Sequence, residues 1–409
     1  MNKRILNDRL NFVGENDYGG HGTKTAVLYN GKRYLMKIPE PVREISDLDL
    51  SLHSVSEYIS CHIAQSMGLN CQNTILGEWT DNDGHKYDCC LCEDFTYGTD
   101  YKLAEVKAMC YKYGDMTQAE RTALEEMPTF ERIENFYKRA ENIDEKEALR
   151  EFGRIFVLDS FVGNTDRHTG NYGFLQNLAT GEIKPSPIYD CGSSLFPTKS
   201  DQEILTKPLG YLSGSADSVI RQPSNEKLRI NYKAFLFEDN LPWYVRDAVL
   251  ELVPRINLGQ IRNCVDSAVP YISQQRAEIL YNVLESRYND TLMPAFKNIL
   301  TKDLDLNVAQ SVNTRRMQDE ILNPIKKYPI KTDIPVKLNN FFVSIFRINE
   351  NVAIVKNAEG TPISYLDLRP SNKYVIKTAA SLMSNGLLPD SFLSDHPAHT
   401  ITGVGGLMR

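Results

Sequence analysis

The sequence has no uninterrupted apolar stretch near the length of about 20 residues that spans a bilayer, and its N-terminus lacks the apolar run of a signal peptide. It also lacks an excess of positive charge. The formal net charge of -7 gives no electrostatic reason to expect a nucleic acid or an anionic membrane as a partner. With 409 residues and 42% hydrophobic content, the chain can bury the cores of two or three domains. We therefore expect a globular protein of the cytoplasm, although signal-independent export would leave no trace in the sequence.

A disulfide framework is also missing. The eight cysteines lie in apolar stretches without the even, loop-defining spacing of a small secreted scaffold, so we interpret them as reduced thiols. The densest group, Cys89-Cys90-Leu91-Cys92, suggests zinc, but a structural site needs a second ligand pair, and neighbouring positions on a strand point to opposite faces. Buried strand residues are the better interpretation.

The first part of the chain, up to about Phe95, is typical of short strands with one inserted helix. Asn30-Gly31 lies between two β-like runs and predicts a hairpin. The predicted strands are Thr25–Tyr29, Arg33–Ile38, Thr74–Trp79 and Lys86–Cys92. Apolar residues at helical spacing before Gly68 predict an amphipathic helix: Val55, Ile59, Ile63 and Met67.

After Asp94 the pattern changes to long helical stretches, which indicates a boundary between a sheet-rich lobe and a helical lobe. The predicted helices are Tyr101–Tyr113, Thr117–Met127, Phe130–Ala140 and Glu145–Phe161. Two predicted strands, Tyr172–Gln176 and Glu182–Tyr189, interrupt them, and helical periodicity returns from about Leu241 to Leu300.

Beyond Tyr328 the pattern changes again, after a segment marked by prolines. Val343–Phe346 and Val352–Val355 are predicted strands, and Lys377–Asn385 is a predicted helix. We therefore predict three parts: a lobe of residues 1–95, a helical lobe of residues 96–325, and a small α/β module of residues 326–409 whose role the sequence does not indicate.

The most informative segment runs from Gly163 to Asn171 and is followed, one predicted strand pair later, by Asp190-Cys191-Gly192. Phosphoryl transfer needs a carboxylate to orient the attacking hydroxyl, and carboxylate and amide oxygens to hold magnesium. Asp166, Asn171 and Asp190 supply that set in the order that kinases use. Each of them alone would more often be a cap or turn residue. Their order and spacing together predict a phosphotransferase site.

The upstream lobe contains the other parts of a triphosphate site. Lys37, on a predicted strand, can reach the α- and β-phosphates, and Glu57, on the following helix, can pair with it. An exposed lysine and a solvent-facing glutamate are the alternatives. A glycine cluster lets backbone amides approach phosphate oxygens, although hairpin turns are also rich in glycine. The residues concerned are Gly19, Gly20, Gly22 and Lys24.

Two neighbouring features allow other interpretations. Gly22-Thr23-Lys24-Thr25 looks like a Walker P-loop fragment, but Thr23 breaks the Gly-Lys adjacency, and Thr25 begins a strand where that motif needs a helix. His168 has no second histidine at ligand spacing, so we assign it a hydrogen-bonding role that fixes the catalytic loop at the nucleotide-binding site. Arg167 either holds a phosphate or the substrate, or braces the loop against a carboxylate.

These motifs resemble those of the HipA-like serine/threonine kinases, and more closely the compact, stand-alone members of that family. The resemblance runs from about Tyr18 to Leu300. It rests on Gly19–Leu28, Leu35–Pro39, Ser56–Tyr58, Ile63–Leu69, Gly163–His168 with Asn171, and Tyr189–Leu195. It implies an α+β, bilobal protein-kinase-like fold with a small β-rich N-lobe, a helical C-lobe and a C-terminal α/β extension.

The resemblance also implies a role for each matched residue. Asp166 would be the catalytic base, Asn171 and Asp190 would bind Mg²⁺, and Lys37 would contact the phosphates of ATP. The segment from Glu93 to Phe95 would form the adenine hinge.

Two departures from the family pattern concern regulation. The long toxins of the family carry an additional N-terminal β domain, so their usual antitoxin-docking surface is expected to be absent here. Those toxins also silence themselves by phosphorylating a serine of the glycine-rich loop, where this chain has Asp17 and Tyr18. A different antitoxin or regulatory partner remains an open expectation.

The sequence favours transfer of phosphate to a protein hydroxyl, with no direct nucleic-acid partner and no membrane. Asp-Arg-His-x-x-Asn also resembles the catalytic loop of phosphoinositide kinases, so a lipid or small-molecule substrate stays open. However, Lys199 and Lys207 are the only cations between Gly192 and Gly214. A third alternative is a nucleotide-binding regulator without catalysis. Autophosphorylation is conceivable at Ser193, Ser194 and Thr198, but we interpret these as ordinary loop residues.

Overall fold

The computed structural model describes residues 2–13, 24–42, 48–112, 116–140 and 142–303, and four strands between residues 333 and 367. The chain forms two compact units, Met1–Ala248 with Leu258–Leu292, and Val249–Asn257 with Met293–Arg409. All predicted site residues belong to the first unit. The predicted division near residues 95 and 325 stays a prediction.

The N-terminal part of the first unit is a five-stranded antiparallel sheet with the strand order β1-β2-β3-β5-β4. Its elements are η1 (Asn7–Arg9), β1 (Leu10–Phe12), β2 (Lys24–Tyr29), β3 (Lys32–Lys37), β4 (Thr74–Thr80) and β5 (Lys86–Glu93). Asn30 and Gly31 both have positive φ, 50° and 78°, as a tight hairpin turn requires. The predicted hairpin is confirmed, and because Lys24 and Thr25 begin a strand, the Walker alternative is excluded.

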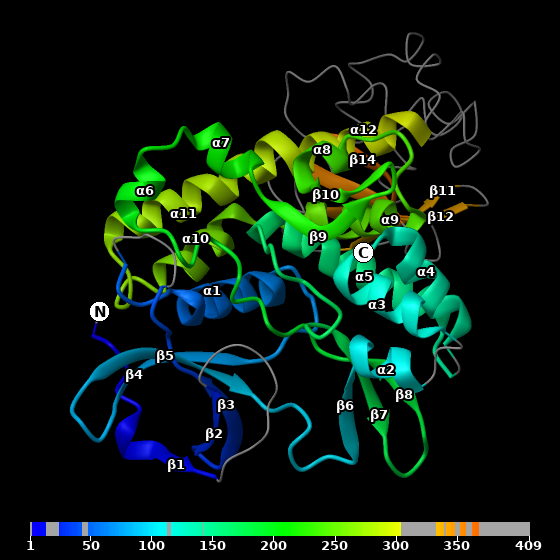
Figure 1. The fold of residues 1–409 in the computed structure, drawn as a ribbon. Coiled ribbons are helices and arrows are strands. Elements are labelled where there is room, and N and C mark those ends of the chain that lie inside the picture. Colours follow the sequence, from blue (N-terminus) through cyan, green and yellow to red (C-terminus); the bar gives the residue numbers. More distant parts are fainter. Residues whose placement is uncertain are drawn as a thin grey trace. The chain divides into compact units, whose positions relative to one another are not determined.

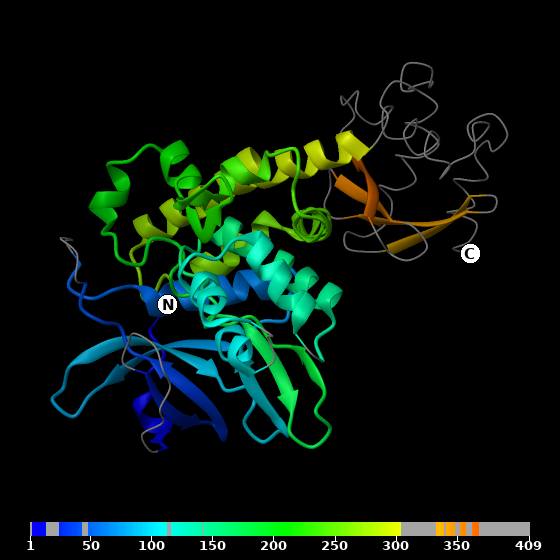
Figure 2. The same cartoon turned by 45° about the vertical axis from the view of Figure 1, so that its right-hand side comes forward.

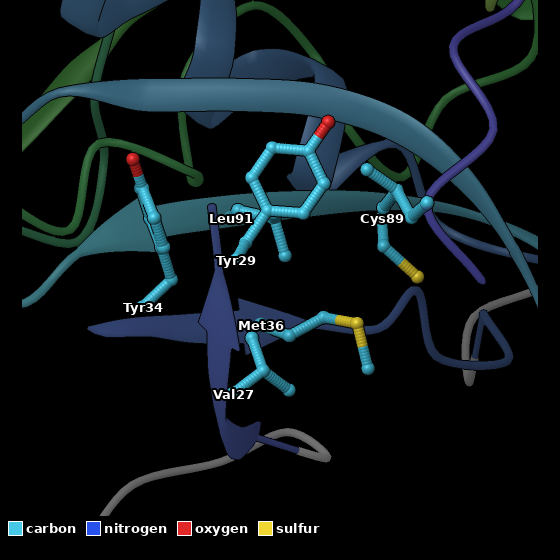
Figure 3. Close-up of a cluster of buried hydrophobic side chains, with 7 residues drawn as sticks. Val27, Tyr29, Tyr34, Met36, Cys89 and Leu91 are labelled. Carbon is cyan, nitrogen blue, oxygen red and sulfur yellow. The ribbon is translucent and has the colours of Figure 1, made fainter. Parts of the chain in front are cut away.

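Strand alternation gives this sheet two different faces. The residues that point to one face form a buried apolar cluster, and Figure 3 shows their side chains converging from three strands. The labelled members are Val27, Tyr29, Tyr34, Met36, Cys89 and Leu91. Lys37, one position beyond Met36, therefore belongs to the opposite face.

That opposite face is covered by α1 (His53–Ser66), which packs along β4 and β5 and contacts α10 (Figure 1). Gly68 follows the helix with φ 78°, a conformation that glycine adopts without a side-chain clash. The predicted helix and its stop are confirmed.

The cysteine predictions also hold. All eight cysteines are free, and Cys89, Cys90 and Cys92 are buried in β5. They pack as interior strand residues rather than as a metal site.

The helical part of the first unit surrounds α5, which contacts α4 and α11 (Figure 2 shows the same unit turned). Its elements up to Tyr232 are β6 (Tyr101–Glu105), α2 (Val106–Lys112), α3 (Gln118–Glu126), α4 (Phe130–Arg139), α5 (Glu145–Val162), β7 (Gly173–Asn177), β8 (Ile183–Pro185), α6 (Asp201–Leu205), α7 (Leu209–Gly214), β9 (Asp217–Gln222) and β10 (Asn225–Asn231). They continue with α8 (Tyr232–Leu236), the first part of α9 (Trp243–Leu252), α10 (Leu258–Asp266), α11 (Gln274–Arg287) and the π-helical turn η3 (Tyr288–Leu292). The end of α9 and η2 (Val253–Arg255) belong to the second unit.

One predicted helix was partly wrong. Tyr101–Glu105, predicted as the start of a helix, is the strand β6, which pairs antiparallel with β7. Pairing with a segment about 70 positions away overrides the local helical pattern, because tertiary contacts decide between weak propensities. The predicted strand Glu182–Tyr189 is also shorter than expected. It ends at Pro185, and Pro187 has no N–H to extend the ladder.

The second unit contains a four-stranded antiparallel meander in the order β11-β12-β13-β14, and α12 contacts its last strand. Its elements are α12 (Met293–Asp303), β11 (Asp333–Leu338), β12 (Phe341–Arg347), β13 (Val352–Lys356) and β14 (Pro362–Asp367). The two predicted strands of this region are confirmed as β12 and β13. The predicted helix Lys377–Asn385 lies outside the described residues.

Candidate functional site

Lys37 contacts two carboxylates, one from its own lobe and one from the helical lobe of the first unit. Its Nζ lies 2.8 Å from Oε2 of Glu57 and 2.7 Å from Oδ1 of Asp190. Glu57 is completely buried on α1, and its other oxygen accepts a hydrogen bond of 2.6 Å from Gln72 Nε2. The structure therefore brings together three residues that the sequence predicted for one site, from β3, α1 and the Asp-x-Gly segment.

The start of α1 is attached to the segment after Asp190, which explains why Glu57 lies at this point. His53 Nδ1 donates to the carbonyl oxygen of Gly192 at 3.0 Å, and the Leu52 N–H donates to the carbonyl oxygen of Pro197 at 2.7 Å. Asp190 itself has φ 56°, a left-handed conformation that is uncommon outside glycine and that recurs at functional sites.

Opposite charges set the ionisation of these groups. Burial would lower the pKa of Lys37, but the carboxylates of Asp190 and Glu57 raise it well above its ordinary value. Burial likewise opposes ionisation of Asp190, yet the ammonium groups of Lys37 and Lys24 hold its pKa below the usual range. Lys37 is therefore cationic and Asp190 anionic at neutral pH.

The loop from Asn164 to Asn171 presents Asp166 at the surface and buries Asn164, Arg167 and Asn171. Asn164 Oδ1 accepts a hydrogen bond from the Asp166 N–H at 3.1 Å, and Asn171 Nδ2 donates to the Asp166 carbonyl oxygen at 2.7 Å. The ring of His168 accepts a hydrogen bond of 3.1 Å from the Gly170 N–H. Both amides thus fix the backbone around Asp166, and His168 has the loop-bracing contact that was expected of it.

Arg167 is the buried centre of this loop. Its guanidinium pairs with both oxygens of Asp159 on α5, at 2.9 and 3.0 Å. It also donates to the carbonyl oxygens of Asn171 and Tyr189 and to Sγ of Cys191. One side chain therefore joins α5, the Asp166 loop and the Asp-x-Gly segment. Of the two interpretations of Arg167, the bracing one describes its contacts.

The oxygens of Asn171 and Asp190 fit a magnesium ion chemically. The nitrogen of the Asn171 amide is held by Asp166, and within the described part of the chain its oxygen receives no hydrogen bond. The Asp190 carboxylate is ionised and 29% exposed, and its Oδ2 lies 3.9 Å from Nζ of Lys24. Amide and carboxylate oxygens are the hard ligands that Mg²⁺ prefers.

The remaining predicted residues differ in where they lie relative to the site. Lys24 lies near Asp190, as expected for the nucleotide site. Glu93 already pairs with Lys32 at 2.7 Å and accepts a hydrogen bond from Asn73. Its backbone N–H donates to the carbonyl oxygen of Asn73 at 2.9 Å, so both its side chain and its N–H are engaged within the lobe. The Phe95 ring lies 6.2 Å from that of Tyr189. Gly19, Gly20 and Gly22 lie outside the described residues, as do Asp17 and Tyr18.

Two carboxylates of this region were missed by the sequence reasoning. Asp159 lies inside the apolar run of α5, and a charge in such a run is a signal that it has a buried partner. Glu105, at the end of β6, is half-buried; burial raises its pKa, while His168 and Lys24 oppose that shift. No sequence signal pointed to Glu105, because its segment was read as a helix.

A comparison with known protein families matches the part of the chain that carries these residues. The model of the HipA-like C-terminal domain matches residues 17–231, which include every predicted site residue. The chain belongs to the HipA-like family. This domain covers more than half of the chain, and it spans strands β2 to β5, α1, the Asp166 loop and the Asp-x-Gly segment.

Individual relatives of the HipA-like family agree. The serine/threonine-protein kinase CtkA of Helicobacter pylori is 28% identical over 303 residues, which are 72% of this chain and 87% of CtkA. The crystal structure of that proinflammatory kinase matches with a TM-score of 0.63 and 27% identity, over 73% of this chain and 99% of the other. A HipA of Shewanella oneidensis MR-1, solved with HipB and operator DNA, gives a TM-score of 0.42 and 14% identity over 70% and 68% of the two chains.

The family match and the likeness to CtkA confirm the predicted family, the α+β kinase-like fold and the enzyme class, a serine/threonine protein kinase. The HipB and DNA partners are those of the Shewanella protein. Among the described residues, no helix is both long and apolar enough to cross a membrane.

Proposed function

We propose that this protein transfers the γ-phosphate of ATP to a serine or threonine hydroxyl of another protein, with Mg²⁺ as cofactor. The observation that supports this most strongly is the contact of one cation, Lys37 Nζ, with both Glu57 and Asp190. A triphosphate site needs an immobilised amine beside a metal-binding carboxylate, and this arrangement supplies both.

Each residue has a proposed task. The exposed carboxylate of Asp166 orients the incoming hydroxyl and accepts its proton, while Lys37, positioned by Glu57, binds the nucleotide phosphates. Asn171 and Asp190 would hold Mg²⁺, which when bound offsets the negative charge of the phosphates. Because all of these groups are held in place before substrate binds, positioning accounts for most of the expected rate gain.

The nucleotide base has a proposed position as well. We assign the backbone from Glu93 to Phe95 to the adenine ring, and the glycine cluster with Lys24 to the phosphates. His168 acts indirectly, through the loop that it braces.

A protein substrate is favoured over a lipid headgroup by the cations after Gly192. Lys199 lies 3.8 Å from Glu203, and the Lys207 ammonium lies over the Tyr211 ring. Both are engaged within the chain, whereas a phosphorylated headgroup would need free cations. Ser194 is completely buried, so an autophosphorylation site after Asp190 would have to be Ser193 or Thr198.

Three wider expectations belong with this proposal. We propose the cytoplasm, where ATP is available, as the compartment. We also propose that the kinase comprises residues 1–95 and 96–325, with residues 326–409 as a separate module. An antitoxin or other regulatory protein stays a proposed partner.

The test compares the wild-type protein with Asp166→Asn, using γ-labelled ATP and Mg²⁺ and, as acceptors, the protein itself, a protein mixture and phosphatidylinositol vesicles. We expect label on protein, reduced about 100-fold or more in the variant, since general bases contribute that much. The matched control is Asp83→Asn, an exposed carboxylate of the β4–β5 turn, which should keep full activity.

Circular dichroism verifies that both variants are folded. Wild-type protein that labels no protein would contradict the proposal, and label on the vesicles alone would favour the lipid alternative. Near-normal transfer by Asp166→Asn would remove that residue from the mechanism.

A further inference from the structure

The hairpin of β9 and β10, labelled in Figure 1, is bound to the loop that carries Asp166. Arg229 Nη1 donates to the carbonyl oxygen of Thr165 at 3.2 Å. Tyr232, the first residue after β10, donates through its hydroxyl to the carbonyl oxygen of Asn164 at 2.8 Å. Thr165 directly precedes Asp166, so the guanidinium of Arg229 lies beside the proposed base.

This hairpin places like charges opposite each other. Arg221 on β9 and Arg229 on β10 are partners in the antiparallel register, and Lys227 lies two residues before Arg229. Like charges directly opposite on a sheet are destabilising unless something offsets them. Arg229 and Lys227 are exposed, and Arg221 is half-buried.

The acidic residues of the hairpin do not offset these charges. Glu226 pairs with Arg132 at 2.9 Å, and Asp217 accepts a hydrogen bond of 2.9 Å from Asn231. Within the described ranges, no carboxylate forms an ion pair with Arg221, Lys227 or Arg229. The Nε of Arg221 is moreover buried, with no hydrogen-bond partner among the described residues. The Nη1 of Arg221 donates to the carbonyl oxygen of Lys227 at 3.3 Å. The hairpin therefore carries three cations without a carboxylate partner among the described residues, and one of them, Arg229, contacts the residue before Asp166.

We propose that this basic cluster, Arg221, Lys227 and Arg229, binds an anionic side chain that neighbours the acceptor serine or threonine of the protein substrate. The inference rests on the proposed function and adds the substrate class, acidic or previously phosphorylated segments. Carboxylate and phosphate share the chemistry that guanidinium groups bind best. An anion between Arg221 and Arg229 also removes their mutual repulsion. The chain as a whole has a formal net charge of -7, so an anionic segment is attracted to the basic cluster rather than to the rest of the surface.

The experiment measures kcat and KM of the full chain on serine peptides that carry one Glu, one phosphoserine or one Gln at each position from about -3 to +3. We expect at least one position where Glu or phosphoserine raises kcat/KM about tenfold over Gln, the size of one charge-assisted hydrogen bond. The Glu and phosphoserine peptides separate the two sources of the anion. The preference should weaken as salt is added.

Three variants test the cluster itself. Arg229→Gln should remove the preference, so that kcat/KM for the preferred acidic peptide falls about tenfold relative to the Gln peptide measured with the same variant. Arg229→Glu should reverse the preference toward a Lys peptide at the same position, a result that a purely structural role for Arg229 would not give. Arg9→Gln, an exposed arginine next to β1, is the matched control and should behave as wild type.

Equal kcat/KM for Glu, phosphoserine and Gln peptides at every position would overturn the inference while leaving the proposed kinase function intact. Loss of activity on all peptides in Arg229→Gln, without a change in preference, would overturn it as well. Wild-type protein that phosphorylates no peptide or protein would refute the proposed function, and the inference would fall with it.

Discussion

Asp159 is a carboxylate buried inside an apolar helix, and its ionisation controls the residue that joins the site together. Burial raises the pKa of Asp159 to about 6, from an ordinary value of 3.8, although Arg167 opposes the shift. The two N–H groups that Arg167 donates to Asp159 need an ionised carboxylate as their acceptor. Protonation below about pH 6 should therefore loosen the Asp166 loop and the Asp-x-Gly segment together.

We expect kcat to fall about tenfold for each pH unit below 6, as a single proton blocks the active form. Stability should change in the opposite sense. Because the folded state holds this proton more tightly than the unfolded chain, ionising Asp159 costs stability as the pH rises from 3.8 to about 6.

The measurement is a pH profile of kcat beside a pH series of denaturant unfolding, for the wild type and Asp159→Asn. The variant is neutral at every pH, like protonated Asp159, so its kcat should be low throughout without an acid limb near pH 6. Its stability should vary less between pH 4 and 6. A variant that keeps the same limb would assign it to another group.

At the scale of the elements, the C-terminus of α5 depends on a buried arginine without a carboxylate partner in the described part of the chain. Arg287 of α11 is 2% exposed, and it donates to the carbonyl oxygens of Phe161, Leu212 and Ser213. These carbonyls lie at the ends of α5 and α7, where the helix dipole favours a cation. Burial lowers the pKa of Arg287 to about 10, so it stays charged at neutral pH.

Gly163 makes this contact possible because it has no side chain that would meet the Arg287 guanidinium. Its φ is 70°, and a Cβ added there would lie 2.7 Å from Cζ of Arg287. Gly163→Ala should destabilise the protein by about 2 kcal/mol or more in urea unfolding, the sum of backbone strain and overpacking. Gly181→Ala is the control, since Gly181 has φ 77° with nothing within 4 Å. It should cost about 1 kcal/mol, from strain alone. Equal losses would show that the Arg287 contact contributes nothing.

The elements also show what the sequence could predict. The Asn30-Gly31 hairpin and the α1 helix were predictable because local turn chemistry and periodicity agree with the tertiary structure. Strand β6 was not, because its partner β7 is distant in sequence. The β9–β10 hairpin was missed because its turn, Pro223-Ser224, joins strands of irregular register with few apolar alternations.

Some residues of the site were also predictable from the sequence, and others were not. Lys37, Asp166, Asn171 and Asp190 were predictable because phosphoryl transfer demands those residue types in that order. The role of Asp159 was not, and the sequence left Arg167 open between binding a phosphate and bracing the loop, because the answer depends on three separated segments meeting at one guanidinium.

At the scale of the whole molecule, the predicted site residues belong to one of two compact units, so a nucleotide should stabilise that unit selectively. We expect hydrogen exchange with Mg²⁺ and ADP present to slow in β3, in α1 and after Asp190, and to stay unchanged in β11–β14. Asp190→Asn, which removes a metal-binding carboxylate, should show no such protection. Protection confined to the second unit would place the nucleotide elsewhere.

The attachment of the segment after Asp190 has a consequence for control. Carbonyl oxygens of Gly192, Ser193 and Pro197 accept hydrogen bonds from His53, Thr165 and Leu52. In many kinases a phosphate on this stretch orders it, whereas here contacts within the chain hold it against α1 and the Asp166 loop. We expect the newly synthesised protein to be active without prior phosphorylation. Total kinase activity should then follow the protein concentration, and inhibition would require a second molecule.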